Sequence, residues 1–183
     1  MRSIVHAVLV GLAGAALLHI VIILSLPSFT GRDAYTRVQA LGELHRFFPL
    51  ANGAEQGLLP VNDDPALSVA VCQISTARVP VRLFAESDVP FWSLAVYDSS
   101  ANEVFSMNDR TSVTGDLDVL VATPIQLTAI RKALPDDLLQ SILVEMEDTD
   151  GYAVLRTFVP TGSHAEAARA FLQAAVCEEF ETR

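Results

Sequence analysis

The sequence is poor in the residues from which metal centres are built. Its 183 residues include only 2 cysteines and 4 histidines, and two of those histidines, His6 and His19, fall inside a long apolar run. The other two, His45 and His164, have no second histidine or cysteine nearby at ligand spacing. Because metal ions in proteins need several clustered ligands, we expect no metal site and no cofactor.

Catalytic motifs are also missing. The chain has neither the Gly-x-Ser-x-Gly elbow of esterases nor a glycine-rich phosphate loop. A nucleophile–histidine–acid triad would depend on His45 or His164, which stand alone. The acidic residues between Glu145 and Asp150 lack the glycine-centred calcium loop, so they indicate a solvated hairpin. We therefore favour a protein without catalytic activity.

Basic residues are few, with 12 Lys+Arg against 22 Asp+Glu and a net charge of -10. An acidic surface repels phosphate backbones, which excludes nucleic acid as an expected partner. It also argues against a basic patch that would hold the domain on anionic lipid.

One long run carries no charge at all. It extends from Ile4 to Leu26, and at about 1.5 Å per residue a helix over it reaches roughly 34 Å, enough to cross a bilayer core of about 30 Å. A cleaved signal peptide is the alternative. The run exceeds the usual ~7–15 apolar residues, and Ser25-Leu26-Pro27-Ser28 offers no small-x-small cleavage site. The sequence predicts an uncleaved anchor over residues 1–27, closed by Pro27.

The orientation of this anchor stays open. Arg2 precedes the run, and Arg32 and Arg37 follow it, so the positive charges on the two sides nearly balance. Residues 28–63 are expected to hold a juxtamembrane amphipathic helix over Asp33–Phe47 and then a linker loop over Pro49–Asp63.

The domain over 64–183 opens with a predicted short helix. Asp64 would cap it and Pro65 would take its first position, with an end near Cys72. Strands follow, and alternation and turn residues predict three hairpins. The expected strand pairs are Gln73–Thr76 with Val79–Ala85, Phe91–Tyr97 with Glu103–Met107, and Ile142–Glu147 with Tyr152–Val159, and Leu117–Ala122 is a further strand.

Two capping boxes predict helices at the margins of these strands. Thr123 and Gln126 form the first, before a helix that extends to about Ala133, and Ser163 and Glu166 form the second. The last helix would bury a stripe at helical spacing, made of Ala168, Phe171, Leu172, Ala175 and Val176. The order of elements is typical of an α+β protein with a mainly antiparallel sheet system.

The most distinctive stretch is Phe91-Trp-Ser-Leu-Ala-Val-Tyr-Asp, followed by Asn102 and by Phe105-Ser-Met-Asn-Asp-Arg110. With Arg110-Thr111 and Val71-Cys72, it resembles a bacterial family of domains of unknown function. Small members of that family are membrane-anchored, and larger relatives are exported proteins with two domains. The resemblance covers nearly the whole chain. It implies a β-rich, jelly-roll-like sandwich with peripheral helices, outside the inner membrane, and it implies no reaction.

Cys72 and Cys177 are the only cysteines. An even count in an exported domain predicts one disulfide, which would tie the start of the β-rich region to the end of the last helix. Two buried free thiols in a cytoplasmic domain are the alternative.

Candidate ligand-binding residues gather on the distinctive stretch. Arg110 offers a bidentate fork for a small anion or carboxylate, Asn108 and Asp109 would orient it, and Trp92 or Tyr97 would lie close by. The competing interpretation, which we favour, is that these polar side chains stitch a turn to the sheet and that the tryptophan is core.

These observations lead to two hypotheses about function. The first is a single-pass protein of the bacterial inner membrane, anchored through Ile4 to Leu26, whose periplasmic domain is an interaction or accessory module for a companion exported protein of the same family. The second is a small-ligand-binding or weakly hydrolytic domain that uses Arg110 and its neighbours.

Overall fold

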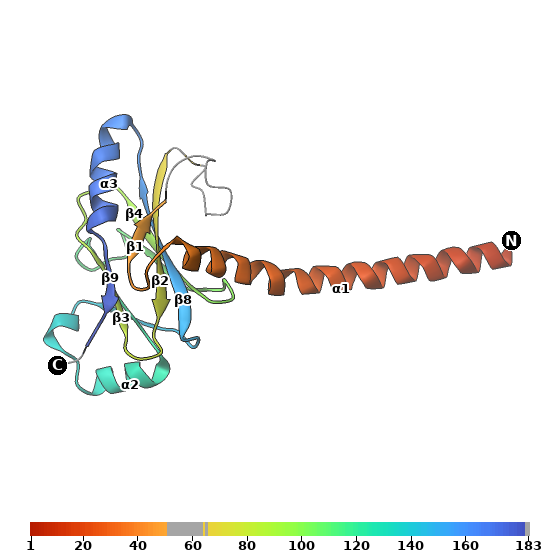
Figure 1. The fold of residues 1–183 in the computed structure, drawn as a ribbon, viewed down its shortest axis with the longest axis horizontal. Coiled ribbons are helices and arrows are strands. Elements are labelled where there is room, and N and C mark those ends of the chain that lie inside the picture. The colour runs from red at the N-terminus through yellow and green to blue at the C-terminus, as the bar shows by residue number, and fades with distance from the viewer. Residues whose placement is uncertain (51–63, 65, 182–183) are drawn as a thin grey trace.

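The computed structural model describes residues 1–50, 64 and 66–181, without the side chains of 27–33. A single long helix leads into a β-rich part made of two sheets, with shorter helices at its margins (Figure 1). The fold is therefore a mixed one, with helices around mainly antiparallel sheets.

Helix α1 spans Arg2–Leu41 and continues through Pro27, where the sequence predicted its end. A proline removes one backbone donor, and helices that are long on both sides of it tolerate that loss, above all in membrane segments. The prediction of a separate helix over Asp33–Phe47 is therefore wrong. Its first part belongs to α1, and Phe47–Pro49 forms strand β1.

The larger sheet has the strand order β1-β2-β8-β4-β5, all antiparallel. Its other strands are β2 (Leu67–Ser75), β8 (Asp150–Phe158), β4 (Trp92–Asp98) and β5 (Glu103–Asn108). The smaller sheet has the order β7-β6-β3-β9, in which only β6 and β7 run parallel. Its strands are β7 (Ile142–Glu145), β6 (Leu117–Ala122), β3 (Val81–Ala85) and β9 (Val176–Glu179). A jelly-roll connection of these strands stays a prediction.

The two sheets share one hydrophobic core. Alternate residues of each strand point into it, as the period of two in a strand requires. The largest fully buried side chains are Trp92, Ile74, Leu83, Leu94, Leu117, Leu120, Leu127, Leu138, Met146, Leu155, Val81 and Val96. The prediction that Trp92 is core is confirmed, and Leu94 and Val96 share its buried face of β4.

The outer face of the five-stranded sheet is covered by the last turns of α1. Val38 packs there with residues of β2 and β8, and Tyr35 and Leu41 flank it. Figure 1 shows α1 leaving this face as an arm, with β3 and β9 on the opposite side of the domain. The apolar part of α1 and the domain are thus joined by continuous helix and by side-chain packing.

Strand β2 replaces the short helix expected between Asp64 and Cys72. Asp64 does cap a turn, since its Oδ1 accepts the Ala66 N–H at 2.9 Å, but a strand follows. Its residues are apolar on both faces, and it pairs with β8 from Leu67 to Ser75. Nine paired residues outweigh a local preference for a helix start.

Two of the three predicted hairpins are wrong. β2 and β3 lie in different sheets, and so do β7 and β8. Each pair is joined by a crossing between the sheets, and the crossings meet where the Thr76 N–H donates to the Thr149 carbonyl at 2.7 Å. Turn residues predict that a chain reverses, whereas the sheet it enters depends on which apolar faces meet. At Gly151 the chain enters β8 so close to β4 that an added Cβ would clash with the Tyr97 carbonyl oxygen.

The β4–β5 hairpin is confirmed, and β6 has the predicted bounds. Helix α2 (Pro124–Lys132) begins with the predicted capping box of Thr123 and Gln126. A short 3-10 turn, η2 (Asp136–Leu138), precedes β7.

Helix α3 (Ala165–Ala174) begins and ends differently from its prediction. Its N-cap is His164, without a side-chain cap, because Ser163 belongs to the preceding 3-10 turn η3 (Gly162–His164) and contacts Thr161. The predicted box of Ser163 and Glu166 is therefore wrong. Ala168, Phe171 and Leu172 are buried as expected, but Val176 belongs to β9.

Candidate functional site

The predicted ligand-binding residues all lie on the β4–β5 hairpin and the turn that follows it. Trp92 begins β4, is fully buried between the sheets, and donates its Nε1–H to the Gly115 carbonyl at 2.9 Å. Tyr97 lies near the other end of β4 and points to the outer face, where its ring stacks on Tyr152 at 5.1 Å between centroids. The structure does not bring the two aromatic rings together.

Asn108 organises the turn after β5. Its Oδ1 accepts the Arg110 N–H at 3.0 Å, and its carbonyl accepts the Thr111 N–H at 3.0 Å. Its own N–H donates to Thr111 Oγ1 at 2.9 Å. Asparagine commonly makes such short-range hydrogen bonds in turns, and here they use its side-chain oxygen and both of its backbone polar groups.

The side chains of Asp109 and Arg110 have fewer hydrogen-bond partners than that of Asn108. The Asp109 N–H donates to the Trp92 carbonyl at 3.2 Å, whereas its Oδ1 is buried and has no hydrogen-bond partner within the described residues. Arg110 is exposed, and its side chain makes no hydrogen bond or ion pair with any described residue. The turn thus brings Asn108, Asp109 and Arg110 together next to the backbone of Trp92, and a ligand role for them stays a prediction.

Tyr152 shows how strongly the outer face is desolvated. Burial raises its pKa above the ordinary value, and the nearby Tyr97 and Asp98 add to the effect because they disfavour a second negative charge. The stacked pair of tyrosines is thus a packed element where α1 meets the sheet.

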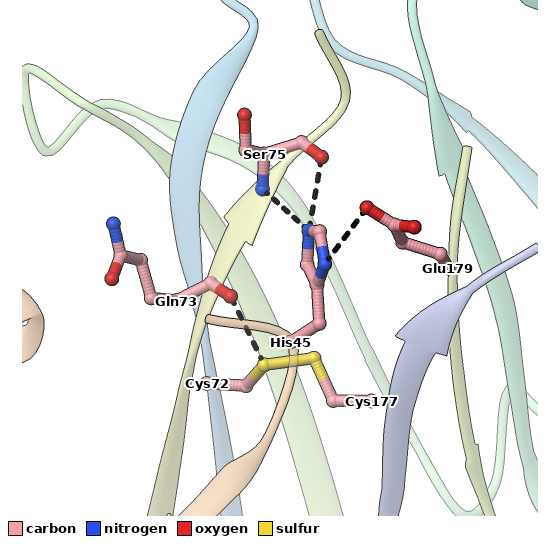
Figure 2. The surroundings of a disulfide bond; sticks show 6 residues. All are labelled: His45, Cys72, Gln73, Ser75, Cys177 and Glu179. Carbon is pink, nitrogen blue, oxygen red and sulfur yellow. Dashed lines mark hydrogen bonds and ion pairs between the residues drawn. A yellow bond between two sulfur atoms is a disulfide. The ribbon is translucent and has the colours of Figure 1, made fainter. Parts of the chain in front are cut away.

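The disulfide forms the centre of a second polar cluster (Figure 2). Cys72 of β2 is bonded to Cys177 of β9, 105 residues later, so the bond links the two sheets. The predicted pairing of the two cysteines is confirmed. Cys177 lies on a strand, β9, and not at the end of the last helix as predicted. Both cysteines are buried, which is typical of a structural disulfide.

His45 lies beside this disulfide, and the sequence did not predict that. We expected it on the juxtamembrane helix, but the helix ends at Leu41 and His45 adopts a left-handed φ of 60°. Its Nε2 lies 3.1 Å from the Ser75 nitrogen and 3.0 Å from the Ser75 carbonyl oxygen, and its Nδ1 lies 3.5 Å from a Glu179 carboxylate oxygen (Figure 2). The His45 ring therefore lies between β2 and β9, the two strands that the disulfide joins.

Glu179 also binds Arg78, with Nη2 donating to Oε1 at 2.9 Å. This hydrogen bond lowers the pKa of Glu179 and raises that of Arg78. The carboxylate thus has two cationic or donor partners already, which leaves the cluster suited to fixing β9 against β2. In the described part of the chain, no group of three or more His, Cys, Asp or Glu residues is placed to hold a metal ion.

A bidentate ion pair on the four-stranded sheet is another feature that the sequence did not reveal. Arg82 Nε and Nη2 donate to the two oxygens of Asp118, each at 2.9 Å, and Ser141 Oγ donates to the same carboxylate. The bond to Asp118 raises the Arg82 pKa. The two residues are 36 positions apart, so no local spacing announces the pair.

Comparison with known families places this arrangement in context. The family model described as a protein of unknown function, DUF1254, matches residues 41–179. The chain belongs to the DUF1254 family. No curated protein matches the chain, and the family description assigns no activity to the DUF1254 domain.

Two solved structures resemble this DUF1254 domain. The crystal structure of the VPA0106 protein from Vibrio parahaemolyticus is similar with a TM-score of 0.56 at 12% identity, over 82% of this chain and 36% of that one. A putative uncharacterized protein from Burkholderia cenocepacia is similar with a TM-score of 0.48 at 12% identity, over 84% of this chain and 40% of that one. The chain therefore spans well under half the length of these proteins, and the first likeness supports the fold alone.

Proposed function

We propose that this DUF1254 protein is a single-pass accessory module, anchored in the bacterial inner membrane, whose domain lies in the periplasm and binds another protein. The observation that carries the proposal is the continuity of α1 from an apolar segment into the domain. The most apolar stretch of 18 residues within Arg2–Leu26 has a mean hydropathy of 2.7, and none of its residues is buried. Such a surface is costly in water and matches the hydrocarbon core of a bilayer.

The packed end of α1 supports anchoring over export by a cleaved leader. The helix continues for 15 residues beyond Leu26, and its last turns bury Val38 against β2 and β8. A domain held in this way has a defined position relative to the membrane, which suits the presentation of a binding surface to a partner.

The inter-sheet disulfide supports the periplasmic side. Disulfides persist in oxidising compartments such as the periplasm and are rare in the bacterial cytoplasm. The partner we propose is a companion exported protein of the same family. The chain spans 36% of the similar Vibrio parahaemolyticus protein, so that protein extends well beyond the matched fold.

Anchoring and sidedness are tested on the full chain in membranes. We expect the intact mass to retain residues 1–26, and a C-terminal alkaline phosphatase fusion to be active while a C-terminal cytoplasmic fluorescent reporter is dark. A mature protein that lacks the apolar segment would replace the anchor with a signal peptide, and a bright cytoplasmic reporter would place the domain on the other side.

Partner binding is tested by co-purification from detergent. Arg110→Ala is compared with Arg131→Ala, an exposed arginine on α2, as the matched control. We expect loss of a co-purifying exported protein with Arg110→Ala alone, at unchanged thermal stability. Equal recovery of partners by both variants would remove the turn from the interaction surface.

A second candidate function, binding of a small anion at the same turn, is favoured by one observation. The guanidinium of Arg110 and Oδ1 of Asp109 both lack partners among the described residues. Asn108 is already used by the turn, so we place this function second. If the protein binds acetate saturably and Arg110→Ala abolishes this binding, anion binding becomes the preferred function.

A further inference from the structure

A cavity of about 740 Å³ lies away from the residues discussed so far, between α3 and the ends of β1 and β2. Ala165, Arg169 and Gln173 of α3 line one wall, and Ser68 and Val69 of β2 line another. Its size falls in the range of roughly 300–1,000 Å³ that is usual for small-molecule sites.

The charge of this cavity is opposite to that of the chain. The protein carries 22 acidic and 12 basic residues, yet the described residues that line the cavity include Arg169 and no acidic side chain. The remaining lining residues are uncharged, and most of them are apolar. Among the described lining residues, an anion thus meets one cation and no carboxylate.

Three polar side chains in the lining still have hydrogen-bonding capacity to offer. Within the described residues, Arg169, Gln173 and Ser68 make no side-chain hydrogen bond or ion pair. Arg169 and Gln173 are four residues apart, so they are neighbours on one face of α3. Guanidinium, amide and hydroxyl groups together supply several donors, which is the set that a carboxylate requires.

The apolar part of the lining determines what the rest of a ligand must be. Leu50, Val159 and Ala165 line the cavity and are half-buried, so each still exposes apolar surface. A small inorganic anion would leave this surface wet, whereas an aliphatic chain would cover it and gain from the burial. The two halves of the cavity therefore favour a molecule with two different ends.

We propose that this cavity binds an apolar carboxylate, with the carboxylate on Arg169 and Gln173 and the aliphatic part against Leu50 and Val159. The site is separate from the Arg110 turn and does not depend on where the anchor places the domain. A surface arginine that is merely solvated would give none of the ligand selectivity that follows from this arrangement.

The test uses the full chain in nanodiscs of zwitterionic lipid, with methyl groups labelled for NMR. Octanoate is the probe. Octanol, which has the aliphatic chain but no charge, and acetate, which has the charge but no long chain, are the partial probes. We expect octanoate to shift the Ala165, Leu50 and Val159 methyl signals saturably, and each partial probe to bind at least about tenfold more weakly.

Two variants decide whether the cavity is the site. Arg169→Gln should weaken octanoate binding about tenfold or more, while Arg131→Gln, the matched exposed helix arginine, should leave it unchanged. Ala165→Leu fills the cavity from α3 and should abolish the shifts, with an otherwise unchanged spectrum. The proposal is overturned if octanoate gives no saturable shift, or if Arg169→Gln and Arg131→Gln bind it equally.

Discussion

The two faces of the five-stranded sheet are buried in different ways. The inner face packs against a second sheet that is assembled from strands far apart in the chain, and a disulfide ties the two sheets together. The outer face is covered by the last turns of one helix, whose other end is apolar and exposed. On adjacent positions of β8, Leu155 points inward and is fully buried, while Val154 points outward and is 9% exposed.

The two faces therefore have different roles: the inner face stabilises the domain, and the outer face attaches the domain to α1. The inner face joins the whole domain, so damage there affects the cooperative fold. The outer face couples the domain to α1, so damage there can free the helix and leave the two sheets in place. The predictions below test this division, from the largest expected effect to the smallest.

Removing the disulfide should have the largest effect. The double variant Cys72→Ala and Cys177→Ala opens a loop closed over 105 residues, and the chain-entropy model assigns about 4–5 kcal/mol to such a loop. We expect the free energy of unfolding to fall by that order in denaturant titrations. An oxidised wild type no more stable than the variant would show that the sheets hold together without the bond.

Leu155→Ala should cost about 2–5 kcal/mol, because it leaves a cavity between the sheets where Leu155 is fully buried. The same titration measures it. Leu139→Ala is the control, since Leu139 is 66% exposed and its truncation should change stability by less than about 0.5 kcal/mol. Equal effects of the two variants would contradict the assignment of Leu155 to the core.

Val38→Asp should release the outer face at a smaller cost. The buried Val38 contributes no more than about 1.5–3 kcal/mol, and a charged side chain cannot stay in its place. We expect faster proteolysis near the end of α1, while the inner core keeps its hydrogen-exchange protection. Global loss of that protection would show that the helix is part of the cooperative core.

Alkaline pH should act on the outer face and have the smallest effect. Folding raises the Tyr152 pKa, so its contribution is fully present below the unfolded value and is lost as pH rises through the folded one. Tyr152→Phe should therefore lose less stability than wild type above the ordinary tyrosine pKa of 10.0. Ultraviolet phenolate absorbance reports the titration, and identical alkaline profiles would place Tyr152 in contact with solvent.

The candidate site was foreseeable in part. Asn-Asp-Arg after a strand predicts a turn, and Asn108 makes the local hydrogen bonds that such a residue offers. The position of His45 beside the disulfide was not foreseeable, because it depends on where α1 ends and on contacts with Ser75 and Glu179, 30 and 134 positions away. Neither the cavity at Arg169 nor the pair of Arg82 and Asp118 has a local signature.

The sequence by itself determined the features that arise from neighbouring residues. The apolar run of α1, the alternation of β4, the capping box at Thr123 and the buried stripe of α3 follow from spacing and side-chain chemistry within a few turns or one strand. Such signals are local, so these features form whatever position the element takes in the fold.

Only the tertiary structure decided which elements meet. The turns after β2 and β7 predicted hairpins, yet both lead the chain into the other sheet. The helix start at Asp64 gave way to a strand, and the end of the last predicted helix became β9. In each case a short local preference competed with the burial of an apolar face against a distant partner, and the larger buried area prevailed.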